Sequence, residues 1–412
     1  MKEMIDRSAR AVVLGLGMII ACASTPARDE PGLDRLRMLQ TDSRYVDPLI
    51  RFPPGFSIGT TLYGSASIET TAPAARRQLE RAAQSGMQGF TYYLDWPDLE
   101  PAPATYDFSE LEANLDALEE RGLSPLINLT LIDIEDLILP SDLLLEDDLL
   151  PGLRLNDPRL ESRLAGLLDQ LLPILEAHEA WFLGFGNEMD ALFETRPELL
   201  DDYVELVQFA VHYTEQLAPA LTTGVVVTTS AVLENRPTFL ALQEAGILTG
   251  MNYAPIRQSD FTVLPTEHIL QDFRLALSRF DGKPVIIQEL TCPNAVTMGG
   301  DQAWQAQCMA ILLDEIAIRP EVRFASVFTL VDFEGAFCEL IQTLFLAGED
   351  GDVPQALFDR LAEYLCTMGV LDGQGEPKPA WESILQRIPA LTGRNRTLRP
   401  GDHPGLRQEL LK

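Results

Sequence analysis

The sequence has few histidines, few tryptophans and few basic side chains. Among its 412 residues are only four histidines and four tryptophans, and 31 lysines and arginines stand against 62 aspartates and glutamates. The formal net charge of −31 would repel nucleic acids and anionic lipid headgroups, so we expect no nucleic-acid partner. A solvated acidic surface accounts for the remaining excess of acid.

The first apolar run, residues 11–21, is too short to span a bilayer and has the length of a signal-peptide core. Basic residues precede it, and it ends in Ile19-Ile20-Ala21-Cys22, which resembles the lipobox of bacterial lipoproteins. This pattern predicts a signal peptide over residues 1–22 with a lipid anchor on Cys22. An ordinary signal cut elsewhere, with Cys22 incidental, is the alternative.

Ala23, and not an aspartate, follows the predicted lipidation site. This resembles bacterial lipoproteins that are sorted by default to the outer membrane. We therefore expect an exported protein at the outer membrane or cell surface. Residues 23–48 are polar and show no clear strand pattern, which predicts a tether.

Export permits disulfides. Beside Cys22 the chain has Cys292, Cys308, Cys338 and Cys366, for which three connectivities exist. Their neighbourhoods in the sequence suggest Cys292 with Cys338 and Cys308 with Cys366, and four buried free thiols are the alternative. The spacing resembles no zinc site.

Strand-like and helix-like segments alternate along the chain, which is the signature of a parallel sheet covered by helices. The predicted strands cover residues 56–64, 89–96, 124–133, 180–190, 221–229, 247–255, 283–292 and 322–333. The predicted helices cover residues 72–86, 108–122, 159–178, 197–217, 237–245, 267–279, 301–318 and 354–368.

Eight such repeats predict an α/β fold, a single (β/α)₈ TIM barrel, and the segment after Gly369 predicts a short C-terminal helix. A doubly wound nucleotide-binding sheet is disfavoured, because the first turn reads YGSASIETT and lacks a glycine-rich phosphate loop. We assign residues 49–390 to the barrel domain and residues 391–412 to a polar tail.

In such a barrel the functional side chains lie at the C-terminal ends of the strands. The fourth predicted strand ends in Asn187-Glu188 and the seventh in Gln288-Glu289. A carboxyl group that ends an apolar strand can have its pKa raised by desolvation or be kept ionised by hydrogen bonds. Cleavage of a glycosidic bond with retention needs both kinds of carboxyl group, about 5–5.5 Å apart.

With GNE at 186–188 and QE at 288–289, the sequence over about residues 56–388 resembles clan A, the large clan of retaining glycoside hydrolases on (β/α)₈ barrels. The stretch 96–123, Asn252-Tyr253 and GEPKPAW at 375–381 resemble it more weakly. The resemblance implies Glu188 as acid/base, Glu289 as nucleophile and Asn187 as a ligand of the sugar 2-hydroxyl. It also implies that Tyr253 hydrogen-bonds the nucleophile.

The sequence departs from this clan at two places. An arginine near the end of an early strand is missing, and the eighth strand ends in Phe328, Thr329 and Asp332 where many members have a tryptophan. The missing tryptophan removes a usual apolar floor for the sugar, so the resemblance does not name the substrate.

Further candidates for substrate contacts are Tyr63, Trp96, Tyr253, Asn128 and Asp190. Asp133 and Asp332 are candidates for binding hydroxyls, and packing is the alternative for each aromatic residue, above all for Tyr92. For Asp190 the alternative is a cap on the loop after the fourth strand. The segments 134–158 and 334–353 are long enough to wall a cleft.

These observations predict an exported, lipid-anchored, monomeric retaining glycoside hydrolase that cleaves a β-linked oligo- or polysaccharide without a cofactor or metal. The acidic turn with Glu349, Asp350 and Asp352 is expected to be solvated, and a calcium site there is the alternative. A non-catalytic carbohydrate-binding barrel lipoprotein is the alternative. A metal-dependent barrel hydrolase is disfavoured, because His178, His212, His268 and His403 fall in predicted helices or the tail.

Overall fold

The computed structural model describes residue 52 and residues 57–61, 73–333 and 355–393. The predicted signal peptide, Cys22 and the tether lie outside the described residues, as do Tyr63, Cys338, the segment 334–354 and the tail from residue 394. None of the described helices is long and apolar enough to cross a membrane.

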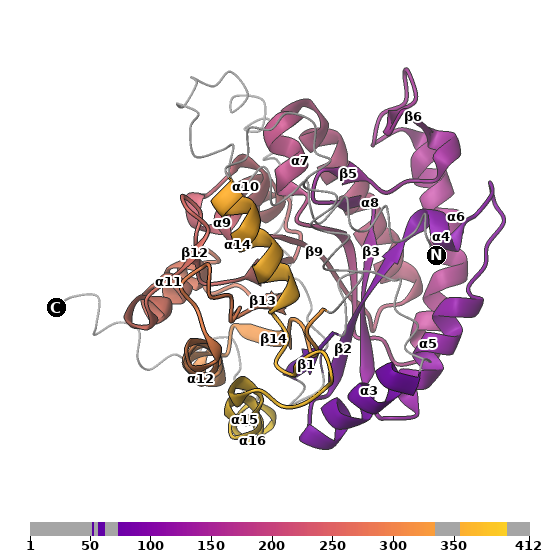
Figure 1. Cartoon of the computed structure of the whole chain (residues 1–412). Coiled ribbons are helices and arrows are strands. Elements are labelled where there is room, and N and C mark those ends of the chain that lie inside the picture. The colour runs from indigo at the N-terminus through magenta and orange to yellow at the C-terminus, as the bar shows by residue number, and fades with distance from the viewer. Residues whose placement is uncertain (1–51, 53–56, 62–72, 334–354, 394–412) are drawn as a thin grey trace.

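Eight parallel strands close into a barrel, as the sequence predicted (Figure 1). They run in the order β3-β2-β1-β14-β13-β10-β9-β8, and pairing of β3 with β8 closes the ring. Their bounds are β1 Ile58–Thr60, β2 Gly89–Asp95, β3 Ser124–Thr130, β8 Phe182–Asn187, β9 Thr222–Thr228, β10 Thr249–Tyr253, β13 Val285–Leu290 and β14 Val322–Val327. Each lies inside a predicted strand.

A helix follows each strand and covers the outside of the barrel (Figure 1). These helices are α3 Pro73–Ser85, α5 Ser109–Glu119, α6 Pro158–Ala177, α8 Leu200–Leu217, α10 Pro237–Glu244, α11 Thr266–Ser278, α12 Gln302–Ile318 and α14 Gln355–Cys366. The helix α6 shows why they form: the Asp157 side chain caps its first turn, and one face buries seven leucines.

Two short helices after the last repeat lie at the N-terminal end of the barrel. They are α15 Pro379–Leu385 and α16 Ile388–Thr392. The Ser57 hydroxyl, just before β1, donates a 2.8 Å hydrogen bond to the carbonyl of Leu391 in α16. The predicted C-terminal helix is thus confirmed and braces the end of the barrel away from the predicted site.

Residues that point into the barrel form layers along its axis. Near the N-terminal ends of the strands the interior is apolar, with Leu126, Phe182, Leu248, Ile286 and Phe324 packed together. Two residues further along β3 and β13 the interior turns polar, because Asn128 and Gln288 replace the apolar side chains. This polar layer lies between the apolar plug and the C-terminal opening.

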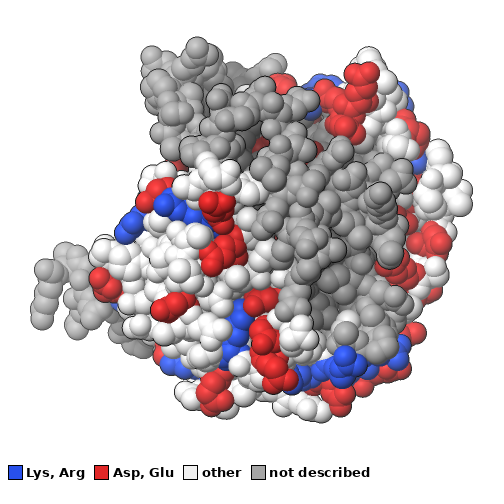
Figure 2. All heavy atoms as spheres, in the orientation of Figure 1, with Lys and Arg blue, Asp and Glu red and all other residues white. Residues whose placement is uncertain are grey.

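Short elements decorate the connections. They are the helices α4 Trp96–Leu99, α7 Asp190–Thr195, α9 Thr229–Glu234, η3 Ser141–Leu143 and η4 Pro197–Leu199, and the strands β4 Ile132–Asp133, β5 Asp136–Leu137, β6 Leu144–Leu145, β7 Asp148–Leu149, β11 Ile256–Arg257 and β12 Thr262–Val263. The segment 134–158, expected as a long loop, contains parts of two antiparallel hairpins, β4–β5 and β6–β7. Figure 2 shows acidic side chains spread over the described part of one face.

The cysteine pairing expected from the sequence is wrong. Cys292, just after β13, forms a disulfide with Cys308 in α12, and Cys366 is also disulfide-bonded. The strand and the helix that follows it in the same repeat lie side by side, so the nearest partner for Cys292 is local. This bond ties the C-terminal end of β13 to the helix layer.

Candidate active site

A cavity opens at the C-terminal end of the barrel and encloses about 850 Å³ of space continuous with solvent. Glu188 and Glu289, the two predicted catalytic residues, both line it. The other lining residues come mainly from the ends of β8, β9, β10, β13 and from α14, and include Asp133, Asn187, Ser230, Asn252, Tyr253, Thr291, Phe328 and Tyr364. The fold therefore brings the two glutamates into one site.

Glu188 follows the last residue of β8 and takes a left-handed backbone conformation. Its φ is +50°, and Gly186 two residues earlier has φ +146°. Its backbone N–H donates a 2.8 Å hydrogen bond to the carbonyl of Val226 in β9. A non-glycine residue held at positive φ is costly and is found preferentially at functional sites. The strand end is thus shaped to direct this one side chain.

Glu289 lies within β13, and its carboxylate is held by a phenol. Tyr93 Oη, from β2, donates a 2.5 Å hydrogen bond to Glu289 Oε1. Burial and the negative charge of Glu289 raise the pKa of Tyr93 far above its ordinary value, so the phenol keeps its proton. A neutral donor therefore faces the carboxylate that the sequence assigns as nucleophile.

A single amide lies beside both glutamates. Asn252 Nδ2 donates a 3.0 Å hydrogen bond to Glu188 Oε1, and Asn252 lies opposite Glu289 in the pairing of β10 with β13. The negative charge of Glu289 raises the pKa of Glu188, so the two carboxyl groups lie close enough to interact. Retaining glycosidases hold their two carboxyl groups about 5–5.5 Å apart, and inverting ones about 6.5–9.5 Å apart.

The site raises the pKa values of both glutamates, chiefly by burial. For Glu188 the negative charges of Glu289 and Asp190 raise the pKa further, and only Asn252 opposes them. For Glu289 the hydrogen bond from Tyr93 and the neighbouring Asn252 amide lower the pKa against the effect of burial. Glu188 is therefore the better proton donor, and Glu289 the better candidate for the ionised group.

Three carboxamides connect the floor of the site to its wall. Asn128 Nδ2 donates to Gln288 Oε1 (2.8 Å), and Gln288 Nε2 donates to Asn187 Oδ1 (2.9 Å) and Tyr93 Oη (3.3 Å). Asn187 Nδ2 in turn donates to Asp133 Oδ1 (3.1 Å). The nitrogen of each of these amides faces acceptors, which fixes the direction of the chain of hydrogen bonds.

The predicted ligands Asn187 and Tyr253 both line the cavity, but the expected contact of Tyr253 is wrong. Its hydroxyl donates a 2.9 Å hydrogen bond to Asp272 in α11, and its ring packs on Phe273. The tyrosine that contacts Glu289 is Tyr93 of β2. Asn128 is buried beneath the site and bonded to Gln288, so it supports the site from below.

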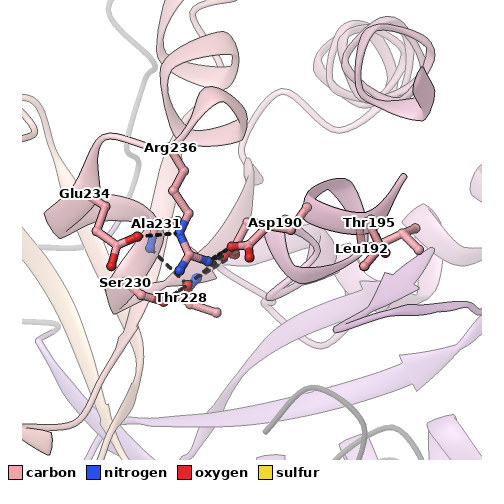
Figure 3. A network of polar contacts seen from close by, with 9 residues as sticks. Asp190, Leu192, Thr195, Thr228, Ser230, Ala231, Glu234 and Arg236 are labelled. Carbon is pink, nitrogen blue, oxygen red and sulfur yellow. Dashed lines mark hydrogen bonds and ion pairs between the residues drawn. The ribbon is translucent and has the colours of Figure 1, made fainter. Parts of the chain in front are cut away.

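Trp96 and Asp190 do not face the cavity. Trp96 is fully buried and donates a 2.7 Å hydrogen bond from Nε1 to Glu100, so no ring face is left for a sugar. Asp190 accepts hydrogen bonds from the backbone N–H and hydroxyl of Thr228 and pairs with Arg236 (Figure 3). It caps the connection between β8 and β9, which is the alternative interpretation of its sequence position. Tyr63 lies outside the described residues.

The other candidates divide in the same way. Asp133 lines the cavity, whereas Asp332 forms a 2.5 Å ion pair with Lys378. Tyr92 is buried and accepts from Asn114 of α5, which is the packing role expected as its alternative. Among described residues, one exposed group with metal-ligand spacing, Asp116, Glu119 and His178, lies on the outer helices and contributes nothing to the cavity lining.

Sequence reasoning missed Tyr93, the role of Asn252, and two aromatic side chains of the cavity, Phe328 and Tyr364. Tyr93 and Asn252 each stand beside a tyrosine that points the other way, toward a helix. The sequence shows that side chains alternate along a strand, but it does not show which residue at the strand's end points into the barrel. Tyr364 comes from the last helix, α14, where no strand-end rule applies.

Solved structures show which proteins share this architecture. The chain shares the fold of (β/α)₈-barrel glycoside hydrolases, which confirms the resemblance inferred from its sequence. No family model matches the sequence, and no curated protein matches it.

Three similar structures can be named. A GH5_18 protein from Bifidobacterium longum subsp. longum has a TM-score of 0.62 at 14% identity, covering 84% of this chain and 80% of that one. A GH5_18 variant from Streptomyces cattleya, in complex with Manβ1-4GlcNAc, has 0.59 at 18% identity, covering 85% and 83%. An exo-β-1,4-mannosidase from Opitutaceae bacterium strain TAV5 has 0.59 at 19% identity, covering 82% and 60%. At these identities the likeness is one of fold.

Proposed function

We propose that the protein is a retaining glycoside hydrolase that cleaves a β-linked glycan. The observation that carries the proposal is the position of Glu188 and Glu289 in one cavity at the C-terminal end of the barrel, where the charge of Glu289 raises the pKa of Glu188. Two neighbouring carboxyl groups, with environments that separate their protonation, are what double displacement requires.

In the first step the ionised carboxylate of Glu289 attacks the anomeric carbon while Glu188 gives its proton to the leaving glycosidic oxygen. The glycosidic bond breaks and an ester to Glu289 forms. In the second step Glu188, now ionised, takes a proton from water as the water oxygen attacks the same carbon. The ester breaks, the sugar leaves with its original anomeric configuration, and both glutamates return to their starting states.

The surroundings support this division of roles. Tyr93 donates to Glu289 and holds it in one orientation, whereas Glu188 faces two negative charges and burial, which favour its protonated form. Phe328 lines the cavity at the end of β14, and its apolar ring is available to the sugar where many related barrels have a tryptophan.

The substrate class rests on the similar structures. One is described as a complex with Manβ1-4GlcNAc and another as an exo-β-1,4-mannosidase. We therefore propose a β-linked oligosaccharide as substrate, with β-mannosides as the first compounds to test. We also propose that the protein is exported and anchored by a lipid on Cys22, on the strength of the lipobox-like residues 19–22.

The experiment uses the chain from residue 23 onward and a panel of aryl β-glycosides and β-linked oligosaccharides, beside Glu188→Gln and Glu289→Gln. We expect hydrolysis of at least one compound by the unaltered protein and a loss of at least about 10²–10⁴-fold in either variant. Glycan binding without hydrolysis would instead favour the non-catalytic barrel. Hydrolysis that survives both substitutions would remove the glutamate pair from the mechanism.

A further inference from the structure

Asp133 is a third carboxyl group in the cavity and has no part in the two displacement steps. It ends β4 and lies opposite Asn187 where β4 pairs with β8. Its side chain therefore lies next to the strand end that carries Glu188. It lines the same cavity as Glu188 and Glu289. Its position therefore puts it within reach of a sugar bound against those glutamates.

The amide chain beneath the site determines how Asp133 is partnered. Asn187 Oδ1 accepts from two donors, Gln288 Nε2 at 2.9 Å and Asn252 Nδ2 at 3.1 Å. Both acceptor positions of this oxygen are thus filled, and the Asn187 amide cannot rotate without losing two hydrogen bonds. Its N–H group must point to Asp133, where it donates at 3.1 Å to Oδ1.

One oxygen of Asp133 remains without a partner. Within the described residues the only hydrogen bond to this carboxyl group comes from Asn187 Nδ2, on Oδ1. The charges that act on it are negative, from Asp95, Glu188 and Asp136, and the described cavity lining contains no lysine or arginine. A carboxyl group in this setting is costly to keep unless a ligand completes its hydrogen bonds.

Asn252 leaves no group for a ligand beside Asp133. Its Oδ1 has no hydrogen-bond partner but is closed off from solvent, and its Nδ2 is committed to Asn187 and Glu188. The free oxygen of Asp133, which lines the cavity, is therefore the group left for a bound molecule. A sugar presents hydroxyl groups that donate and accept, and one such group satisfies this oxygen.

We propose that Asp133 is a specificity-determining residue that hydrogen-bonds a hydroxyl group of the sugar held between Glu188 and Glu289, with Asn187 fixing its orientation. The inference rests on the proposed function. It goes beyond it by assigning a residue that selects the sugar and takes no part in proton transfer or bond formation.

The test compares unaltered protein, Asp133→Ala and Asp133→Asn on the best aryl glycoside and on its analogues that each lack one hydroxyl. We expect Asp133→Ala to lose about 10- to 100-fold in kcat/KM on the parent sugar, the range for leaving a buried hydrogen-bond partner unsatisfied. On one deoxy analogue the kcat/KM of Asp133→Ala and that of the unaltered protein should agree within about twofold, because this analogue lacks the hydroxyl group that Asp133 binds. Equal losses on every analogue, or no loss on the parent, would overturn the proposal.

Glu135→Gln is the matched control, because this carboxyl group belongs to the same hairpin connection but does not line the cavity. It should leave the whole series unchanged. The unfolding temperatures of all variants show whether a loss of activity comes from a loss of folding. If Asp133→Ala does not fold, Asp133→Asn replaces it, because asparagine has nearly the same shape as aspartate. If the unaltered protein cleaves nothing, calorimetric binding of the same sugars replaces kcat/KM, so failure of the catalytic proposal is distinguishable from failure of this one.

Discussion

Tyr93 and Glu289 are joined by a 2.5 Å hydrogen bond although two strands, β1 and β14, lie between theirs in the barrel. Tyr93 is also the acceptor for Gln288 Nε2 at 3.3 Å, so the residue before Glu289 orients the phenol that Glu289 binds. The pair replaces the contact that the sequence assigned to Tyr253. It puts a neutral, permanently protonated donor against the proposed nucleophile.

Removing this phenol should move the acidic limb of the pH profile. The hydrogen bond from Tyr93 lowers the pKa of Glu289, so Tyr93→Phe raises that pKa and leaves less ionised nucleophile at a given low pH. We predict that the rising limb of kcat/KM shifts to higher pH and that kcat falls about tenfold or more.

Tyr92→Phe provides the control for that measurement. Tyr92 is the preceding residue of the same strand, is also buried, and has its hydroxyl bonded to Asn114 on the outside of the barrel. It should lower stability without moving either limb of the profile. A shift of equal size in both variants would mean that the Tyr93 contact does not tune Glu289.

Phe328, and not the predicted Trp96, should contact the sugar. Trp96 is fully buried and satisfies Glu100, so Trp96→Phe should lower the free energy of unfolding by about 1–3 kcal/mol, the cost of an unpaired buried acceptor, and leave KM unchanged. Phe328→Ala should raise KM, because its ring lines the cavity. Denaturant unfolding and steady-state kinetics on both variants check this. A raised KM for Trp96→Phe would contradict the burial argument.

Asp133 should make the protein less stable as the pH rises. Burial raises its pKa from an ordinary value of 3.8 to about 8, so between these values the folded protein binds a proton that the unfolded chain has lost. Its contribution to stability is complete below about pH 4 and is lost as the pH rises through about 8. Asp133→Asn removes the titration, so we predict that its unfolding temperature, relative to unaltered protein, rises between pH 4 and pH 8.

A constant difference across that range would contradict the prediction for Asp133. Glu112→Gln, an exposed change on α5, controls for general effects of removing a negative charge.

The disulfide should contribute to stability more than to chemistry. Cys292 and Cys308 close a loop with a sequence separation of 16, for which the loss of chain entropy in the unfolded state corresponds to about 3 kcal/mol. The double variant Cys292→Ala with Cys308→Ala should lose about that much free energy of unfolding and keep its kcat at low temperature. A large fall in kcat with unchanged stability would show that the bond positions Glu289 directly.

The fold was predictable from the sequence because its signals are local and repeat eight times. Short apolar strands alternate with helices of amphipathic period, and Gly86 and Gly122 stand where helices end, at φ +94° and +69°. Once the order of strands is known, the rule that active residues gather at their C-terminal ends selects Glu188 and Glu289. Neither step needs information from distant contacts.

The other site residues were not predictable, because the sequence does not show which of two neighbouring residues at a strand's end points into the barrel. In the pairs Tyr92-Tyr93 and Asn252-Tyr253 one residue points into the barrel and its neighbour points to a helix, and both members are chemically plausible ligands. Trp96 failed as a sugar platform for a related reason: the chain begins α4 at this residue, which turns the ring inward onto Glu100. The cysteine pairing required knowledge of which elements touch.

The central claim, that Glu289 is the nucleophile of a retaining glycosidase, is tested most directly by trapping the ester. The chain is incubated with 2-deoxy-2-fluoro-β-glycosyl fluorides of the manno and gluco series, and the labelled peptide is sequenced by mass spectrometry. The account predicts one fluorosugar per chain, attached to Glu289, and no label in Glu289→Gln. A label on another residue, or hydrolysis that inverts the anomeric configuration, would contradict it.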